Sequence, residues 1–110
     1  MEELKLGAKI SLVGFKEIPR AEMQIVKKIL GNYLNALERY TEINGLSITL
    51  RILHNSEKQG EVKRYELKAQ LNSKLGTFHS DAMDVNLFSA LDELLKKIEK
   101  QMSKEKEKRD

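Results

Sequence analysis

The residues that most clearly suggest a chemistry are lysines near the C-terminal end of the chain. A helix that follows the capping residue Asn86 turns by about 100° per residue, which gathers its leucines on one side. The opposite side then carries Lys96, Lys97, Lys100 and Lys104. Ammonium groups in such a row can neutralise nucleic-acid phosphates and release their counterions without reading sequence. Taken alone, a lysine-rich outer face is more often only a solvated surface.

A second cationic surface is predicted on an earlier helix. Pro19 suits the first helical position, and apolar residues then recur at three- and four-residue steps until about Asn44–Gly45. The outer side of this helix would carry Lys28 and Arg39, with Lys27 at its edge. Two helices are therefore expected to present cations outward.

The elements that must position these helices are four predicted strands. Alternating apolar and polar side chains indicate strands at residues 8–15, 46–53, 64–71 and 77–82. Polar turn segments at 54–60 and 72–76 separate the last three strands, which makes them antiparallel neighbours, whereas a strand–helix–strand crossover is normally parallel. We therefore expect a two-layer α+β fold with the order β-α-β-β-β-α. It would have a four-stranded mixed sheet, both helices on one face and the other face in water.

Length and composition indicate a single domain. The chain has 110 residues, and we expect one domain over 1–110, with a core of about 8–104 and a flexible tail at 105–110. The absence of cysteine excludes disulfides and thiolate ligands and fits a reducing compartment, so the cytoplasm is the expected location. No apolar run is long enough to span a membrane, and no membrane partner is expected.

Catalytic and metal sites are not expected. The only histidines are His54, in a predicted turn, and His79, at an outward strand position. Asp81 and Asp84 lie on either side of a strand end, where capping explains them better than acid–base chemistry. There is no phosphate-binding glycine-rich loop. We therefore expect no enzymatic activity, no cofactor, no metal and no small-molecule substrate.

Several residues in the second half carry a resemblance to a known family. They are Gly76, Thr77–His79 leading to Ala82, Ala90–Asp92 and Lys97–Gln101, together with Leu37–Tyr40 upstream. In their order and spacing they resemble the ribosome hibernation promoting factor family, which includes the ribosome-associated inhibitor proteins once called sigma modulation proteins. Because the chain stops just after its last helix, it resembles the short form, without the dimerisation domain of longer relatives.

The resemblance implies a non-enzymatic stress factor that occupies the decoding region of the small ribosomal subunit and blocks translation on idle ribosomes. The partner would be that subunit and its ribosomal RNA, and the free chain would be a monomer. The positions that match the family's RNA contacts are Lys96, Lys97, Lys100 and Lys104 on the last helix, and Lys28 and Arg39 on the first. Gly31, Asn32 and Asn35 depart from this pattern, because relatives usually carry more charge there.

Other binding modes remain alternatives. The chain can also be read as a protein interaction module that uses a sheet edge or the lysine faces to bind a protein or a second copy. A double-stranded-RNA-binding-like domain has a related order, although its lysines cluster where this chain has Asp92 and Glu93. An RNA-recognition sheet is disfavoured, because the outward positions Arg51, Arg64, Lys68 and His79 include no aromatic residue.

Overall fold

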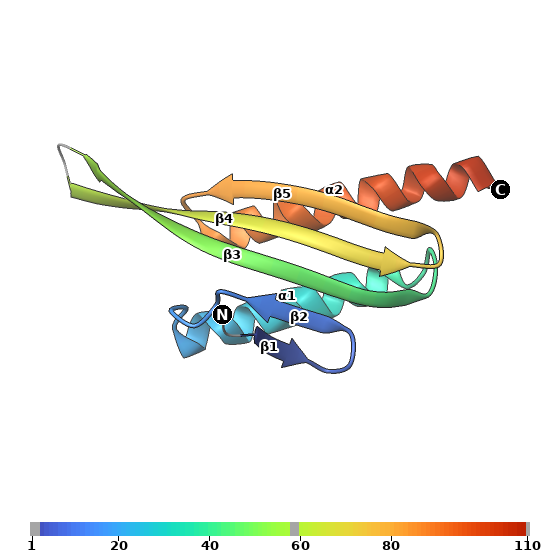
Figure 1. Ribbon diagram of the computed structural model, residues 1–110, viewed down its shortest axis with the longest axis horizontal. Helices are drawn as coiled ribbons and strands as arrows, with labels where there is room; N and C mark the ends of the chain where they lie inside the picture. Colours follow the sequence, from blue (N-terminus) through green and yellow to red (C-terminus); the bar gives the residue numbers. More distant parts are fainter. Residues whose placement is uncertain (1–2, 58–59, 110) are drawn as a thin grey trace.

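The chain forms one mixed sheet with two helices on one of its faces (Figure 1). The computed structural model describes residues 3–57 and 60–109. In chain order the elements are β1 (Glu3–Leu6), β2 (Ile10–Val13), α1 (Arg20–Leu37), β3 (Ile43–Glu57), β4 (Gly60–Ser73), β5 (Gly76–Asp84) and α2 (Leu87–Arg109). The strands lie side by side in the order β1-β2-β3-β4-β5.

The sheet combines one parallel pair with three antiparallel pairs. β2 and β3, joined through α1, run parallel, with Ile10 opposite Leu46. β1 pairs antiparallel with β2, and β3, β4 and β5 form an antiparallel meander. The β3–β4 hairpin is much longer than its neighbours and projects beyond the two-layer body at one end, and the C-terminal part of α2 extends past the sheet at the other (Figure 1). The molecule is accordingly elongated, 53 × 26 × 22 Å in extent.

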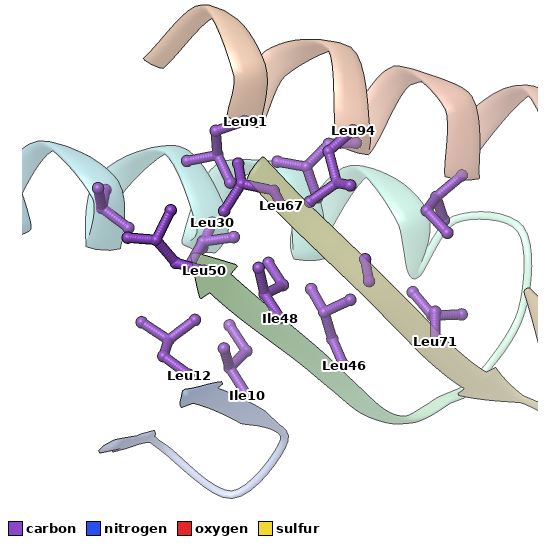
Figure 2. Packing of buried hydrophobic residues seen from close by; sticks show 14 of the residues in the cluster. Ile10, Leu12, Leu30, Leu46, Ile48, Leu50, Leu67, Leu71, Leu91 and Leu94 are labelled. Carbon is purple, nitrogen blue, oxygen red and sulfur yellow. The ribbon is translucent and has the colours of Figure 1, made fainter. Parts of the chain in front are cut away.

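A single apolar layer lies between the sheet and the helices. Alternate residues of the central strands point to the same side and meet leucines from both helices (Figure 2). The residues labelled there are Ile10, Leu12, Leu30, Leu46, Ile48, Leu50, Leu67, Leu71, Leu91 and Leu94. Burying a leucine side chain fully contributes about 2 kcal/mol of transfer free energy. This layer is therefore what attaches the helices to the sheet.

The predicted α+β class is confirmed, but the predicted number of strands is wrong. The sheet has five strands instead of four, because Glu3–Leu6 pairs with β2 as an additional N-terminal strand. The element order is consequently β-β-α-β-β-β-α. The parallel crossover and the antiparallel meander are both as predicted.

The bounds of all four predicted strands differ from those of β2 to β5, and three differences are larger. The first helix ends at Leu37 instead of near Asn44–Gly45, and the amide of Tyr40 donates to the Leu37 carbonyl in the turn that follows. The segment 54–60, predicted as a turn, belongs to the strands as far as Glu57 and again from Gly60, and residues 58–59 lie outside the described residues. α2 continues through residues 105–109. The flexibility of residues 105–110 stays a prediction.

The close approach of the residue after β2 to β3 depends on a glycine. Gly14 has φ +86°, and a Cβ atom placed on it would lie 2.2 Å from the carbonyl oxygen of Leu50. We expect Gly14→Ala to lower the free energy of unfolding by about 3 kcal/mol or more, because a left-handed residue and a backbone clash would be imposed together. Urea unfolding followed by circular dichroism measures this change.

Gly7→Ala is the matched control. Gly7 also has a positive φ, +64°, but nothing lies within 4 Å of a Cβ at that position. Its substitution should therefore cost only about 1 kcal/mol, the conformational part of the effect. Equal losses in the two variants would show that the contact with Leu50 is unimportant.

Candidate nucleic-acid interface

The placement of the α2 lysines follows from the way this helix is anchored. Asn86 caps the helix, since its side-chain oxygen accepts a hydrogen bond from the amide of Ser89 at 3.0 Å. The apolar side of α2 is buried through Leu87, Ala90, Leu91, Leu94, Leu95, Ile98 and Met102. The opposite side must then face solvent, and Lys96, Lys97, Lys100 and Lys104 are all exposed there.

Lys96 is tied to the junction between the two helices. Its ammonium lies 2.8 Å from one carboxylate oxygen of Asp92, and the other oxygen accepts a 2.8 Å hydrogen bond from the hydroxyl of Tyr33 on α1. The hydrogen bonds from Lys96 and Tyr33 lower the pKa of Asp92, and the bond to Asp92 raises the pKa of Lys96. Burial and, secondarily, this hydrogen bond raise the pKa of Tyr33 to about 12.

Lys97 is directed toward the sheet instead. Its ammonium donates to the backbone carbonyl of Asp81 at 2.7 Å and lies 3.9 Å from the carboxylate of Glu93. One helical turn further on, the side-chain amide of Gln101 donates to the carbonyl of His79, also at 2.7 Å. Both carbonyls belong to β5, the last strand of the sheet, so two α2 side chains occupy its outer edge.

Lys100 and Lys104 are the least engaged members of the row. Within residues 3–57 and 60–109, no ion pair or hydrogen bond involves either ammonium. Both line an open hollow of about 380 Å³ between α2 and β5. The other lining residues are His79, Ser80, Asp81, Lys97 and Gln101. This hollow has more cationic than anionic side chains, and it is open enough to admit a phosphate group.

The α1 side of the predicted surface is less continuous. Lys27 and Lys28 are exposed on the helix, as predicted. Arg39 is exposed too, but the prediction that it lies on the helix is wrong, because α1 ends at Leu37 and Arg39 is in the turn beyond it. The structure thus gathers the four α2 lysines on one helix face and leaves Arg39 outside the helical row.

The sequence pattern does not reveal two residues that line the hollow, His79 and Gln101. From the sequence, His79 is considered as a ligand or base, as an outward position of the sheet and as part of the family pattern, and Gln101 as part of that pattern. Neither is predicted to lie beside the lysines. A usable signal is present, because Lys97 and Gln101 are four residues apart on one flank of a helix and His79 and Asp81 are two apart on a strand. Recognising it requires knowing that this flank lies over β5.

Other kinds of site are absent from the part of the chain that the structure describes. No group of three or more His, Cys, Asp or Glu residues is arranged to hold a metal ion there. Neither described helix has an apolar stretch that could cross a membrane.

Comparison with known proteins gives one family and one fold. A family model described as Sigma 54 modulation protein / S30EA ribosomal protein matches residues 20–110. Among solved structures, the N-terminal domain of Thermus thermophilus Protein Y is similar, with 18% sequence identity and a TM-score of 0.55 over 87% of this chain and 93% of that one. At this identity the likeness concerns the fold. No protein in the curated set matches.

The Tyr33–Asp92 hydrogen bond generates a prediction about the helix pair. Tyr33→Phe should lower the free energy of unfolding by about 1 kcal/mol, since one partly exposed hydrogen bond is lost while the ring is kept. The raised pKa of Tyr33 means that this contribution is complete below about pH 10 and disappears as the pH rises through about 12. Urea unfolding at neutral pH measures the loss of stability.

Alkaline titration of tyrosinate absorbance provides the second measurement. The wild type should show a component near pH 12 that Tyr33→Phe removes. Asp92→Asn keeps a hydrogen-bond acceptor but loses the charge, so it should lower the pH at which this component titrates. A high-pH component that persists after Tyr33→Phe would contradict its assignment to Tyr33, and one that Asp92→Asn leaves unmoved would contradict the contribution of the hydrogen bond.

Proposed function

Because the chain belongs to the family of sigma 54 modulation proteins and S30EA ribosomal proteins, we propose that it binds the small ribosomal subunit and inhibits translation on idle ribosomes. Members of this family are ribosome-associated modulation factors. The observation that carries the proposal is the row of exposed α2 lysines, above all Lys100 and Lys104 beside their open hollow. We assign this surface to contact with ribosomal RNA.

The proposed contact is electrostatic and insensitive to base sequence. Lys96, Lys100 and Lys104 follow one another at four-residue intervals, which spaces their Cα atoms by about 6 Å along the helix axis. Each ammonium that neutralises a phosphate releases counterions, and a folded RNA surface is recognised mainly by its shape and its backbone. Lys96 and Lys97 lie at the margins of this surface, where Asp92 and the Asp81 carbonyl compete with a phosphate for their ammonium groups.

The first helix is proposed to make a weaker, secondary contact. Lys27, Lys28 and Arg39 supply its positive charge. The uncharged positions Gly31, Asn32 and Asn35 separate Lys28 from Arg39, so these cations do not form a continuous row. α2 should therefore contribute most of the RNA affinity.

Inhibition would follow from occupancy alone. A protein seated in the decoding region between the head and body of the small subunit excludes messenger and transfer RNA by steric overlap, which requires no reaction. The proposed function is accordingly non-enzymatic, hibernation-type and part of a stress response. We propose that it requires no cofactor or small-molecule substrate and takes place in the cytoplasm. Residues 1–110 would form one ribosome-binding domain.

Co-sedimentation with purified small subunits and whole ribosomes tests this proposal. The variant Lys100→Glu with Lys104→Glu reverses two cations that have no ion pair in the described chain. We expect its affinity to fall by about tenfold or more at low salt, and its salt dependence to be weaker than that of the wild type. Wild-type binding should itself decrease steeply between low and moderate salt.

The matched control reverses two cations away from α2. Arg51 on β3 and Lys63 on β4 are exposed, and Arg51→Glu with Lys63→Glu gives the same change in net charge. This control should pellet with ribosomes as the wild type does. Failure of the wild type to bind at any salt concentration would overturn the ribosome assignment, and equal loss in both double variants would overturn the assignment to α2.

A further inference from the structure

The two outer edges of the sheet are treated differently. At β5, the side chains of Lys97 and Gln101 donate hydrogen bonds to two backbone carbonyls of the outer edge. The opposite edge is β1, and within the described residues no side chain forms a hydrogen bond with the backbone of Glu3–Leu6. An uncovered edge strand presents amides and carbonyls that another strand can pair with. β1 also precedes residues 20–110, the part of the chain that the family model matches.

β1 has an alternating pattern with one apolar side. Leu4 pairs with Leu12 of β2 and points to the same side of the sheet, where Leu12 is buried. Leu4 itself is 42% exposed. Glu3 and Lys5 point to the other side of the sheet, and each is exposed. The strand therefore offers one uncovered leucine between two opposite charges.

We propose that a second copy of this chain adds to the sheet at β1, in antiparallel orientation and centred on Leu4. In this register Leu4 lies opposite Leu4 of the second copy, Glu3 opposite its Lys5, and Lys5 opposite its Glu3. Antiparallel residues that are directly opposite share a face, so this register brings leucine to leucine and acid to base. The edge of β1 is thus complementary to itself.

The neighbouring registers are unfavourable. Shifting the pairing by one residue would set the leucine of one copy opposite a charged residue of the other and place the two on the same face. Centring the pair on Glu3 would set Glu3 opposite Glu3, and centring it on Lys5 would set Lys5 opposite Lys5. Like charges directly opposite each other destabilise a strand pair. Centring on Lys5 would also pair Leu4 with Leu6 of the second copy, so the apolar residues alone do not exclude it. Charge therefore selects the register centred on Leu4.

An apolar hollow beside β1 supports the same placement. It has a volume of about 350 Å³ and is lined by Leu4, Leu12, Phe15, Ile18 and Met23, together with Glu3 and Lys16. Because directly opposite side chains lie about 5 Å apart, Leu4 of a second copy would extend the apolar wall of this hollow and lose its own exposure to water. The ion pair that association would replace, Lys5 with Glu3 of the same chain, is long at 3.9 Å and solvent-exposed.

The proposed association is weak and reversible, since a strand of four residues buries much less surface than a stable dimer needs. It revises the expectation, drawn from the sequence, that the free chain is a monomer. It lies away from the main proposed ribosome contact on α2, because β1 and β5 are at opposite edges of the sheet and α2 packs against β4 and β5 (Figure 1).

Sedimentation velocity over a wide concentration range, from micromolar toward millimolar, is the test. We expect the wild type to sediment faster as its concentration rises. Glu3→Lys and Lys5→Glu should each remain monomeric over the same range, because each variant sets like charges opposite one another. We expect each substitution to raise the dissociation constant by about tenfold or more. An equimolar mixture of the two variants should associate again, since an edge that carries two lysines then meets an edge that carries two glutamates.

Further variants distinguish pairing at the β1 edge from non-specific association. Leu4→Asp should abolish association, whereas Ile25→Asp, which changes a leucine-sized residue 46% exposed on α1, should leave it unchanged. The double variant Glu3→Lys with Lys5→Glu should associate as the wild type does. A wild type that stays monomeric throughout, or single variants that associate as strongly as it does, would overturn the proposal. Failure of the mixture to recover association would overturn the proposed register.

Discussion

The burial of the apolar side of α2 against the sheet is the constraint on which the rest of the structure depends. Four α2 residues are completely buried: Leu91, Leu94, Leu95 and Ile98. From β5, the hydroxyl of Ser80 donates a 2.9 Å hydrogen bond to the carbonyl of Leu94. This contact fixes the rotation of the helix about its axis. Once the leucines are buried, the position of every polar residue on α2 relative to α1, β5 and solvent is determined by helical geometry.

The lysine row is consequently divided among three environments. The flank of α2 toward α1 carries Asp92 and Lys96, which meet Tyr33, while the flank toward β5 carries Lys97 and Gln101. Lys100 and Lys104 face the solvent and line the hollow. Four lysines that look equivalent on a helical wheel therefore differ in what their ammonium groups contact. Formal charge overstates how many of them are available to a phosphate.

Element types were predictable from periodicity, but several boundaries were not. The four residues of β1 give too short an alternation to identify a strand, and its status depends on pairing with β2. The end of α1 was misplaced because Tyr40 and Ile43 continue the apolar spacing after Leu37. Both pack against the core, one from a turn and the other from β3, so spacing alone does not distinguish them from helical residues.

The candidate site was predictable to a similar degree. The helical wheel correctly predicts that four lysines are exposed, because exposure follows from the period of the helix. They are Lys96, Lys97, Lys100 and Lys104. Their partners were not predictable, since Tyr33 and the Asp81 carbonyl belong to elements that are distant in sequence from the lysines they affect.

The β1 edge of the sheet can be understood from the strand that it protects from solvent and from unwanted pairing. Without β1, the edge of the sheet would be β2, whose sequence ISLV is largely apolar. β1 covers that edge with a strand that carries charges, which is a common protection against unwanted strand pairing. Here the two charges have opposite signs and flank a leucine symmetrically, so they disfavour the registers on either side while favouring the one between them. Charges on an edge strand therefore act in two ways: they oppose pairing where like charges meet, and they favour one register where opposite charges meet.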